Sequence, residues 1–403
     1  VRTSKFDGGY VFLENDSWYK VFCRYIFKFM SQKGILIIVP TFSPNVGGVE
    51  THMDDLVKEL DRLNYKVYIH TYSPITTPGV KWKGIEKYNN IYIRRYRWFG
   101  KTLLHRLEKI PLLDFVYITP YLFLRVFIFL LFNHKKIDII HAQGLNAAFI
   151  GKCLKKIFLK KLIVSIHAVY EVELSSSITF FIRFILSSAD KILTLSKASY
   201  NELVSLGVDR NKLDVYKYWI DLDTFIPLGN KKELRIELGV PDVFTVLFVG
   251  RLTRMKGIVE LVSVAKELPF INFIFIGNGP LENYLLTECK RRENITFLGR
   301  INNAILYRYY NIADVFCVPS QYEEGFGRVA MEAVSCGLPV VGSNKGGVPE
   351  ALDNTVSILL DPTVENLTEA IFKLYKDKTL YNLSLIHISE PTRPLYISYA
   401  VFC

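Results

Sequence analysis

Hydrophobic residues in this chain fall in short runs that polar residues, glycine and proline separate, and the runs form two series. The first series opens with an apolar strand at Gly34–Pro40, a Gly-containing loop, and a helix from about Val49. That helix carries one apolar stripe, formed by Met53, Leu56, Val57, Leu60 and Leu63. Further predicted elements are strands at Val67–Thr71, Ile137–His141 and Leu162–His167 and an apolar helix near Pro120–Phe132.

The second series starts at Val243–Gly250 and again alternates strands with helical segments. Its other predicted strands are Phe273–Gly277, Ile295–Leu298, Val315–Val318, Pro339–Gly342 and Ser357–Leu360. Alternation of this kind is typical of parallel sheets with helices on both faces. The pattern therefore predicts an α/β protein with two Rossmann-like, doubly wound domains, and ligands of such folds bind in a cleft.

The length of 403 residues also favours two domains, since it exceeds what one hydrophobic core usually serves. We predict domains at 33–219 and 220–382, because Asp221, Pro227 and Gly229 interrupt the apolar pattern at the junction. Residues 1–32 precede the first strand and are expected to be upstream translation or a short extension, with a membrane-surface helix at Trp18–Phe29 as the alternative.

The C-terminal 21 residues of the chain break the α/β rhythm. Residues 383–403 resemble translated sequencing adapter, which predicts a non-native tail and a truncated second domain.

Charge and cysteine content narrow the function classes. The six cysteines show no metal-ligand spacing, which disfavours a zinc site and a disulfide framework and is consistent with a cytoplasmic protein. The formal net charge of +11 comes without a nucleic-acid-binding signature, so an anionic substrate or anionic membrane lipid is the expected partner, and nucleic acid is not.

The most informative stretch is VPSQYEEGFGRVAMEAVSCGLPVV, residues 318–341. It predicts a strand ending at Pro319, a turn over Ser320–Gly325 and a helix over Phe326–Ser335. The unpaired N–H groups of that helix favour an anion, and Gly325 and Gly327 let a ligand approach the backbone. Taken singly, Glu324 and Glu332 could be a helix-dipole partner and a solvated helix residue.

Taken together, this stretch resembles the donor-sugar motif of family 4 glycosyltransferases, which are of the group 1 type and have the GT-B fold. The resemblance implies that Glu324 contacts hydroxyls of the transferred sugar and that Glu332 holds the nucleotide ribose. It also implies that the backbone of Phe326 and Gly327 helps to hold the donor, and that the anomeric configuration is retained.

Two further loops are candidates for binding the diphosphate. FVGRLTRMKG, residues 248–257, places Arg251 and Lys256 between a strand and a helix, where two cations can offset charge on a departing diphosphate without a metal ion. The run resembles the family's diphosphate clamp; Arg254 is expected to face solvent. Gly47 and Gly48 stand where a phosphate-approach loop is expected, and residues 44–50 resemble the family's first-domain loop.

Histidines lie at the ends of two predicted strands. His167 follows an apolar strand at the edge where ligands gather in such sheets, and the family carries a histidine there beside the reacting sugar. His141 is a further candidate to line the cleft, and Glu50 and His52 are weaker ones. The turn at Ile276–Glu282 predicts positive φ at Gly277 and Gly279, whereas Tyr218–Asp221 departs from the family pattern.

The sequence thus predicts a retaining hexosyltransferase that uses a nucleoside diphosphate sugar and needs no cofactor or metal. The acceptor is expected to be a glycan or a lipid-linked molecule, in cell-surface polysaccharide or glycolipid synthesis. A sugar-nucleotide epimerase and a catalytically silent sugar-nucleotide-binding protein remain alternatives. The Pro120–Phe132 run looks too short to cross a membrane and is expected to be buried, with the first domain resting on a membrane as the alternative.

Overall fold

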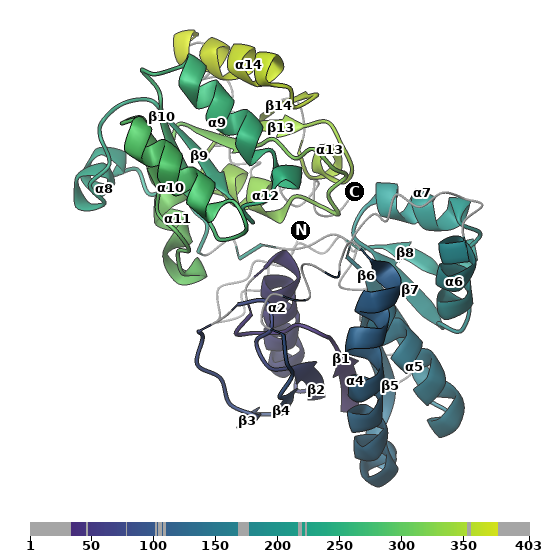
Figure 1. The fold of residues 1–403 in the computed structure, drawn as a ribbon. Coiled ribbons are helices and arrows are strands. Elements are labelled where there is room, and N and C mark those ends of the chain that lie inside the picture. Colours follow the sequence, from purple (N-terminus) through teal and green to yellow (C-terminus); the bar gives the residue numbers. More distant parts are fainter. Residues whose placement is uncertain are drawn as a thin grey trace, which may run out of the picture. The chain divides into compact units, whose positions relative to one another are not determined.

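The computed structural model describes residues 34–377, apart from 46, 78, 101–102, 104–106, 108–109, 168–176, 217–219, 222–223 and 353–355. The predicted extension 1–32, the predicted tail 383–403 and the Tyr218–Trp219 part of the junction lie outside the described residues. The described residues group into two compact units, one running to Tyr216 and the other starting at Ile220. Each unit is an α/β domain with its own sheet (Figure 1).

The first unit holds an eight-stranded sheet in the order β3-β4-β2-β1-β5-β6-β7-β8. Its strands are β1 (Gly34–Ile38), β2 (Lys66–Tyr72), β3 (Ile85–Tyr88), β4 (Ile91–Tyr96), β5 (Ile137–Gln143), β6 (Lys161–Ile166), β7 (Lys191–Thr194) and β8 (Leu213–Val215). Neighbouring strands pair in parallel except at the edge, where β3 runs antiparallel to β4. Every residue of β1 is buried, as expected of an apolar strand in the middle of a parallel sheet.

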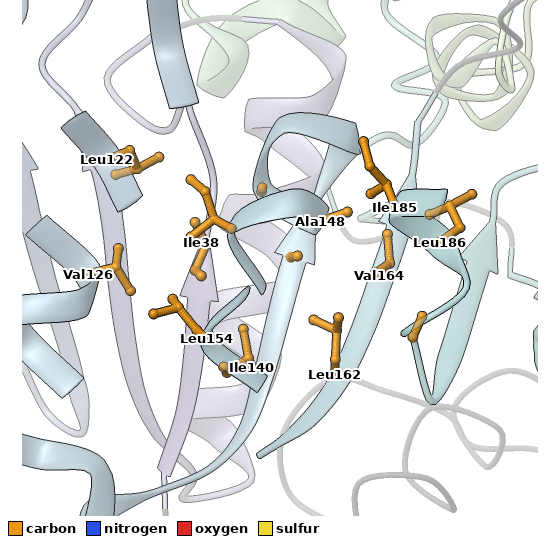
Figure 2. Close-up of a cluster of buried hydrophobic side chains, with 14 of the residues drawn as sticks. Ile38, Leu122, Val126, Ile140, Ala148, Leu154, Leu162, Val164, Ile185 and Leu186 are labelled. Atoms are coloured by element: carbon orange, nitrogen blue, oxygen red, sulfur yellow. The ribbon is translucent and has the colours of Figure 1, made fainter. Parts of the chain in front are cut away.

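The helices of this unit are α2 (Gly48–Arg62), α4 (Pro111–Asn133), α5 (Gly144–Phe158), α6 (Ser177–Leu186) and α7 (Lys197–Ser205). Figure 2 shows how the inward side chains of α4, α5 and α6 meet the sheet: Leu122 and Val126, Ala148 and Leu154, and Ile185 and Leu186 surround strand residues such as Ile140 and Val164. These three helices therefore share one continuous core with the central strands.

The second unit holds a six-stranded, parallel sheet in the order β11-β10-β9-β12-β13-β14. The strands are β9 (Thr245–Val249), β10 (Asn272–Ile276), β11 (Ile295–Phe297), β12 (Val315–Val318), β13 (Val340–Ser343) and β14 (Ser357–Leu360). The helices are α8 (Lys231–Glu237), α9 (Ile258–Glu267), α10 (Glu282–Arg291), α11 (Asn303–Ile312), α12 (Arg328–Ser335), α13 (Val348–Ala351) and α14 (Val364–Lys376). The predicted strands of this series match these within two residues, and α9 and α14 pack over a shared core.

The turn after β10 confirms the predicted positive φ at two glycines. Gly277 has φ 146°, and a Cβ on it would lie 1.8 Å from the carbonyl oxygen of Gly250. Gly279 has φ 156°, and its Cβ would lie 2.6 Å from the carbonyl oxygen of Leu252. Any side chain here would push the turn away from the loop that follows β9.

One prediction for the first unit was wrong, and the strands β3 and β4 were not predicted. These strands lie in a basic and aromatic region before Arg106, where charges and tyrosines at exposed positions hide the strand pattern. The helix predicted at Pro120–Phe132 is α4, which begins at Pro111 and contains Pro120 in its interior.

Helix α4 is also longer and more exposed than predicted. Residues Leu112–Lys136 are long and apolar enough to cross a membrane by length and composition alone, and 39% of the most apolar window is buried. One face, with Leu122, Val126 and Leu130, belongs to the domain core. The opposite face keeps large apolar side chains exposed, so the expectation of a buried helix holds for one face only.

Candidate active site

The predicted donor motif follows β12 and leads into α12. The helix begins at Arg328, two residues later than predicted, because Gly327 takes the left-handed conformation (φ 70°) at the N-cap. A glycine suits this position, since other residues pay a steric penalty there. Residues Ser320–Gly327 therefore form a loop that ends at the first N–H groups of a helix, where partial positive charge makes a favourable setting for an anion.

A second loop holds this one in place. The N–H of Gly347 donates to the carbonyl of Glu324 (2.7 Å). A Cβ on Gly346 would lie 2.5 Å from the Glu324 carbonyl oxygen, and a Cβ on Gly347 would lie 2.3 Å from that of Gly325. The Gly-Gly pair before α13 thus permits a backbone-to-backbone contact that larger residues would prevent. Sequence reasoning missed these two glycines, although a Gly-Gly-x-Pro run before a short helix was a usable signal.

The structure brings Lys256 and Glu324 together. The Lys256 Nζ lies 2.8 Å from Glu324 Oε1, and the side chains are 21% and 7% exposed. Ser320 Oγ also donates to Glu324. Burial alone would lower the pKa of Lys256, but the Glu324 carboxylate and Tyr322 outweigh it and raise the pKa above its usual value. Lys256 therefore keeps its positive charge over the neutral pH range.

Backbone contacts explain why these two loops meet. The N–H of Gln321 donates to the carbonyl of Met255 (2.8 Å). Gly257 has φ 71°, and a Cβ on it would lie 2.0 Å from the Pro319 carbonyl oxygen. The loop after β9 and the loop after β12 are neighbours because the two strands pair in the sheet. Sheet topology, rather than sequence proximity, places Lys256 beside Glu324.

Arg251 and Tyr322 complete this side of the site. Arg251 lies just after β9 and is exposed, and Arg254 is exposed as predicted. Burial raises the pKa of Tyr322, while the charges of Lys256 and Arg251 act on it in the opposite direction. The Lys256 Nζ lies 5.2 Å from the centre of the Tyr322 ring. Both predicted cations therefore border Tyr322, a residue that sequence reasoning did not single out.

Glu332 is buried inside α12 and is 2% exposed, so the solvated-residue alternative does not describe it. Arg328 Nε donates to Glu332 Oε1 (2.9 Å), and the Tyr310 hydroxyl donates to Glu332 Oε2 (3.0 Å). Burial, followed by the charge of Glu332, holds the pKa of Tyr310 well above its usual value. Both partners fix the carboxylate one helical turn from the donor loop. Neither was predicted. Tyr310 lies on another helix, so its contact is not local in sequence, whereas the i,i+4 spacing of Arg328 and Glu332 was a usable signal.

In the first unit, Gly47 and Gly48 stand at the start of α2 as predicted. Gly47 has an extended backbone (φ 175°), which any residue can adopt. A side chain at this position is therefore limited by the space around it and not by the backbone conformation. A Cβ there would lie 2.4 Å from Glu50 Oε2, whereas a Cβ on Gly48 would meet nothing within 4 Å. The Glu50 carboxylate therefore occupies the space that a side chain at position 47 would take.

Two of the histidine candidates, His141 and His167, lie in one polar network at the ends of β5 and β6. Gln143 links them: its Oε1 lies 2.7 Å from His167 Nε2, and its Nε2 lies 3.0 Å from His141 Nε2. His141 Nε2 is also 2.8 Å from Ser165 Oγ. In this arrangement His167 carries its proton on Nε2, and His141 accepts at Nε2.

His52 joins the same network from α2. Its ring centre lies 5.9 Å from that of His167, and its Nε2 is 3.1 Å from the Tyr216 hydroxyl. Burial lowers the pKa of His167 to about 4 and that of His141 to about 3, so both are neutral at pH 7. Sequence reasoning missed Gln143, although its position two residues after His141 on one strand puts both side chains on the same face.

Comparisons with known proteins identify the family of the chain. Residues 230–384 match the family described as glycosyl transferases group 1, and residues 46–224 match the one described as Glycosyltransferase Family 4. The two matches adjoin and cover both units.

The chain belongs to the family 4, group 1 glycosyltransferases. Among relatives of this glycosyltransferase is the D-inositol 3-phosphate glycosyltransferase of Mycobacteroides abscessus, which is 34% identical over 47% of this chain and 45% of its own length. The sulfoquinovosyl transferase SQD2 of Arabidopsis thaliana is 31% identical over 54% of this chain and 44% of its own. The matched stretch thus spans less than half the length of these relatives.

Solved structures establish the fold of this glycosyltransferase. The Anabaena protein HepE, solved in complex with UDP and glucose, superposes with a TM-score of 0.70 over 92% of this chain and 96% of its own, at 20% identity. The fold is of the GT-B type, with two Rossmann-like domains, as predicted. The structure thus gathers the predicted site residues of this glycosyltransferase into two groups. Arg251, Lys256, Glu324 and Glu332 lie in the second unit with Gly325, Phe326 and Gly327, and His167, Gly47 and Gly48 lie in the first. The predicted cleft stays a prediction.

Proposed function

We propose that this glycosyltransferase moves a hexose from a nucleoside diphosphate sugar to a hydroxyl of an acceptor, with retention of the anomeric configuration. The observation that supports the proposal most strongly is the Lys256–Glu324 ion pair (2.8 Å), which adjoins the loop leading to the first N–H groups of α12. It puts a cation for the diphosphate and a carboxylate for sugar hydroxyls within one contact of each other.

The proposed roles follow from the chemistry of each group. Lys256 and Arg251 hold the diphosphate and offset the charge that develops on it as the bond to the sugar breaks. Glu324 accepts hydrogen bonds from the sugar. Glu332 accepts from the ribose while Arg328 and Tyr310 keep its carboxylate in place. No metal ion or cofactor takes part in this scheme.

The reaction balances without a protein nucleophile. The bond between the sugar C1 and the phosphate oxygen breaks, and its electron pair stays on the phosphate. The acceptor oxygen forms a new bond to C1 on the same face, and its proton passes to the departing phosphate oxygen. His167, held neutral and with its Nε2 proton directed at Gln143, serves as an uncharged group beside the sugar rather than as a general acid.

The partners are part of the same proposal. HepE has been solved with UDP-glucose, which makes UDP-sugars the first donors to test. The name of one relative, a D-inositol 3-phosphate glycosyltransferase, points to a phosphorylated polyol as an acceptor to test. We propose a glycan or lipid-linked acceptor in cell-surface polysaccharide or glycolipid synthesis. We place the enzyme in the cytoplasm, with peripheral association at an anionic membrane.

A donor panel tests this function. The purified full chain is incubated with nucleoside diphosphate sugars, first for thermal stabilisation and then for donor turnover with and without acceptors. A binding donor present at about 100 times its dissociation constant should add about 2.7 kcal/mol to the free energy of unfolding. Release of nucleoside diphosphate supports transfer or slow hydrolysis. An isomerised sugar nucleotide without release would indicate the epimerase, and binding without any turnover would indicate the silent binder.

A further inference from the structure

The outer face of α4, α5 and α6 exposes an unusual number of large apolar side chains. On α4 these recur every three or four residues opposite the face that packs on the sheet, and Leu112 and Phe132 are 72% and 81% exposed. On α6, Phe180 is 73% exposed, and Phe184 is also exposed. Surfaces of this kind mark contact sites with a protein or a membrane, because monomeric soluble proteins rarely expose large contiguous apolar patches.

The three helices form one surface rather than three separate ones. The Phe115 ring of α4 lies 5.0 Å from that of Phe149 on α5 and 5.2 Å from that of Phe181 on α6. Figure 2 shows that the inward sides of all three helices share one core. Their outward sides therefore face away from the same face of the sheet. We call this surface the α4–α6 face.

Charge on the α4–α6 face is almost entirely positive. Across α4, α5 and α6, Asp114 is the one acidic residue in the sequence, whereas the exposed Arg125, Lys156 and Arg183 are cationic. Lys152 is buried, and Lys155 is paired with Asp190 at 2.7 Å. Lys135 and Lys136 are exposed and lie three and four residues beyond the exposed Phe132 at the end of α4.

We propose that the α4–α6 face docks on the surface of an anionic lipid bilayer, with its apolar side chains at the level of the acyl chains and its lysines among the head groups. Aromatic and aliphatic side chains flanked by lysines suit this boundary. A second copy of the chain fits poorly, because a two-fold contact through this face would set lysines against lysines with almost no acidic partner. The face packs on its own core on the other side, so it rests on the membrane rather than crossing it.

Vesicle flotation tests this docking independently of the transfer chemistry. The full chain is mixed with vesicles of phosphatidylcholine alone or of phosphatidylcholine with phosphatidylglycerol, at low and at high salt. Flotation is expected with the anionic vesicles and should weaken with salt, because each lysine at the surface adds an attraction that salt screens. Lys135→Ser with Lys136→Ser should lower partitioning about thirtyfold at low salt.

Apolar variants separate this surface from other contacts. Phe132→Ser with Phe180→Ser should lower partitioning into the vesicles at least about tenfold, because each substitution removes an aromatic ring that would be buried in the bilayer. Ile236→Ser on α8, which removes another highly exposed apolar side chain (82%), should leave partitioning unchanged. Circular dichroism and thermal melting confirm that all variants are folded, which is expected because the substituted side chains are exposed.

Four results would overturn the inference. The first is absence of flotation with anionic vesicles at low salt, and the second is equal flotation of the Phe132→Ser, Phe180→Ser variant. The third is loss of flotation in Trp18→Ser with Phe22→Ser while the α4–α6 variants still bind, which would place the contact in the N-terminal segment. The fourth is a wild-type dimer that the Phe132→Ser, Phe180→Ser variant abolishes, which would assign the face to a second copy.

Discussion

Replacing Lys256 by methionine should separate its catalytic charge from its packing. Methionine keeps an unbranched apolar side chain over Tyr322 but removes the ammonium group that lies 2.8 Å from Glu324. If Lys256 offsets charge on the departing diphosphate, turnover should fall by about two to three orders of magnitude, the loss expected when one preorganised donor is removed from a charge-stabilising site. That loss corresponds to about 2.7–4 kcal/mol in the barrier.

The structure also predicts what the substitution does to stability. Glu324 is almost fully buried and keeps Ser320 as a hydrogen-bond donor, but it loses its cation. A buried group left short of a partner costs about 1–3 kcal/mol, so the thermal midpoint should drop without loss of the folded state. The double variant Lys256→Met, Glu324→Gln removes the uncompensated carboxylate and should recover part of that stability while remaining inactive.

The assay measures initial rates of transfer while the donor concentration is varied up to saturation, which separates kcat from KM. Arg254→Met is the matched control, because Arg254 is a cation two residues away that faces solvent; its turnover should stay within about twofold, as expected of a screened surface charge. A folded Lys256→Met enzyme with turnover near that of the wild type would refute the assigned role.

Four other predictions follow from named contacts. Gln143→Leu removes the link between His141 and His167, so it should lower kcat about tenfold and alter the dependence of kcat on pH. Gln143→Glu should keep part of the activity, because its carboxylate can still accept a hydrogen bond from His167. Steady-state rates measured against pH check both results. Tyr310→Phe should raise KM for the donor more than it lowers kcat, because Glu332 loses the hydrogen bond from the Tyr310 hydroxyl. It should also lower the free energy of unfolding, measured with urea, by about 1–2 kcal/mol. Gly277→Ala should destabilise the second unit by more than about 2 kcal/mol, since its Cβ would clash with the Gly250 carbonyl, whereas Gly239→Ala, also at positive φ but in open space, should cost about 1–2 kcal/mol. The free energy of unfolding should fall by about 1.4 kcal/mol per pH unit for each of His141 and His167 as the pH drops from about 6.5 towards 4. The reason is that both histidines take up a proton in the unfolded chain but not in the fold. Thermal melts at several pH values should show a shallower dependence on pH in His141→Gln than in the wild type.

The parallel strands and the donor loop could be predicted from sequence because the signals are local. Apolar runs such as β1 and β12 are buried on both faces, and the Gly-rich turn with Glu324 lies in one continuous stretch. The start of α12 was misplaced by two residues because Phe326 is apolar and looks helical. Gly327 delays the start of the helix because it takes the left-handed conformation, and the sequence does not show that conformation.

Contacts between segments that lie far apart in the chain could not be predicted from the sequence. Tyr310 reaches Glu332 from α11, Gln143 bridges two histidines from β5 and β6, and Gly347 closes over the donor loop from the segment after β13. Each depends on which strands are neighbours in the sheet. The exposed side of α4 was also hidden, because an apolar helix that packs on a core and one that faces a lipid surface have similar composition.

The diphosphate of a sugar nucleotide should bind at Lys256, beside Glu324. Titration calorimetry of the wild type and Lys256→Met with the matching nucleoside diphosphate and monophosphate measures this binding. The wild type should bind the diphosphate at least about tenfold more tightly than the monophosphate, and this preference should largely disappear in the variant. An unchanged preference for the diphosphate in a folded Lys256→Met protein would show that Lys256 does not bind the diphosphate.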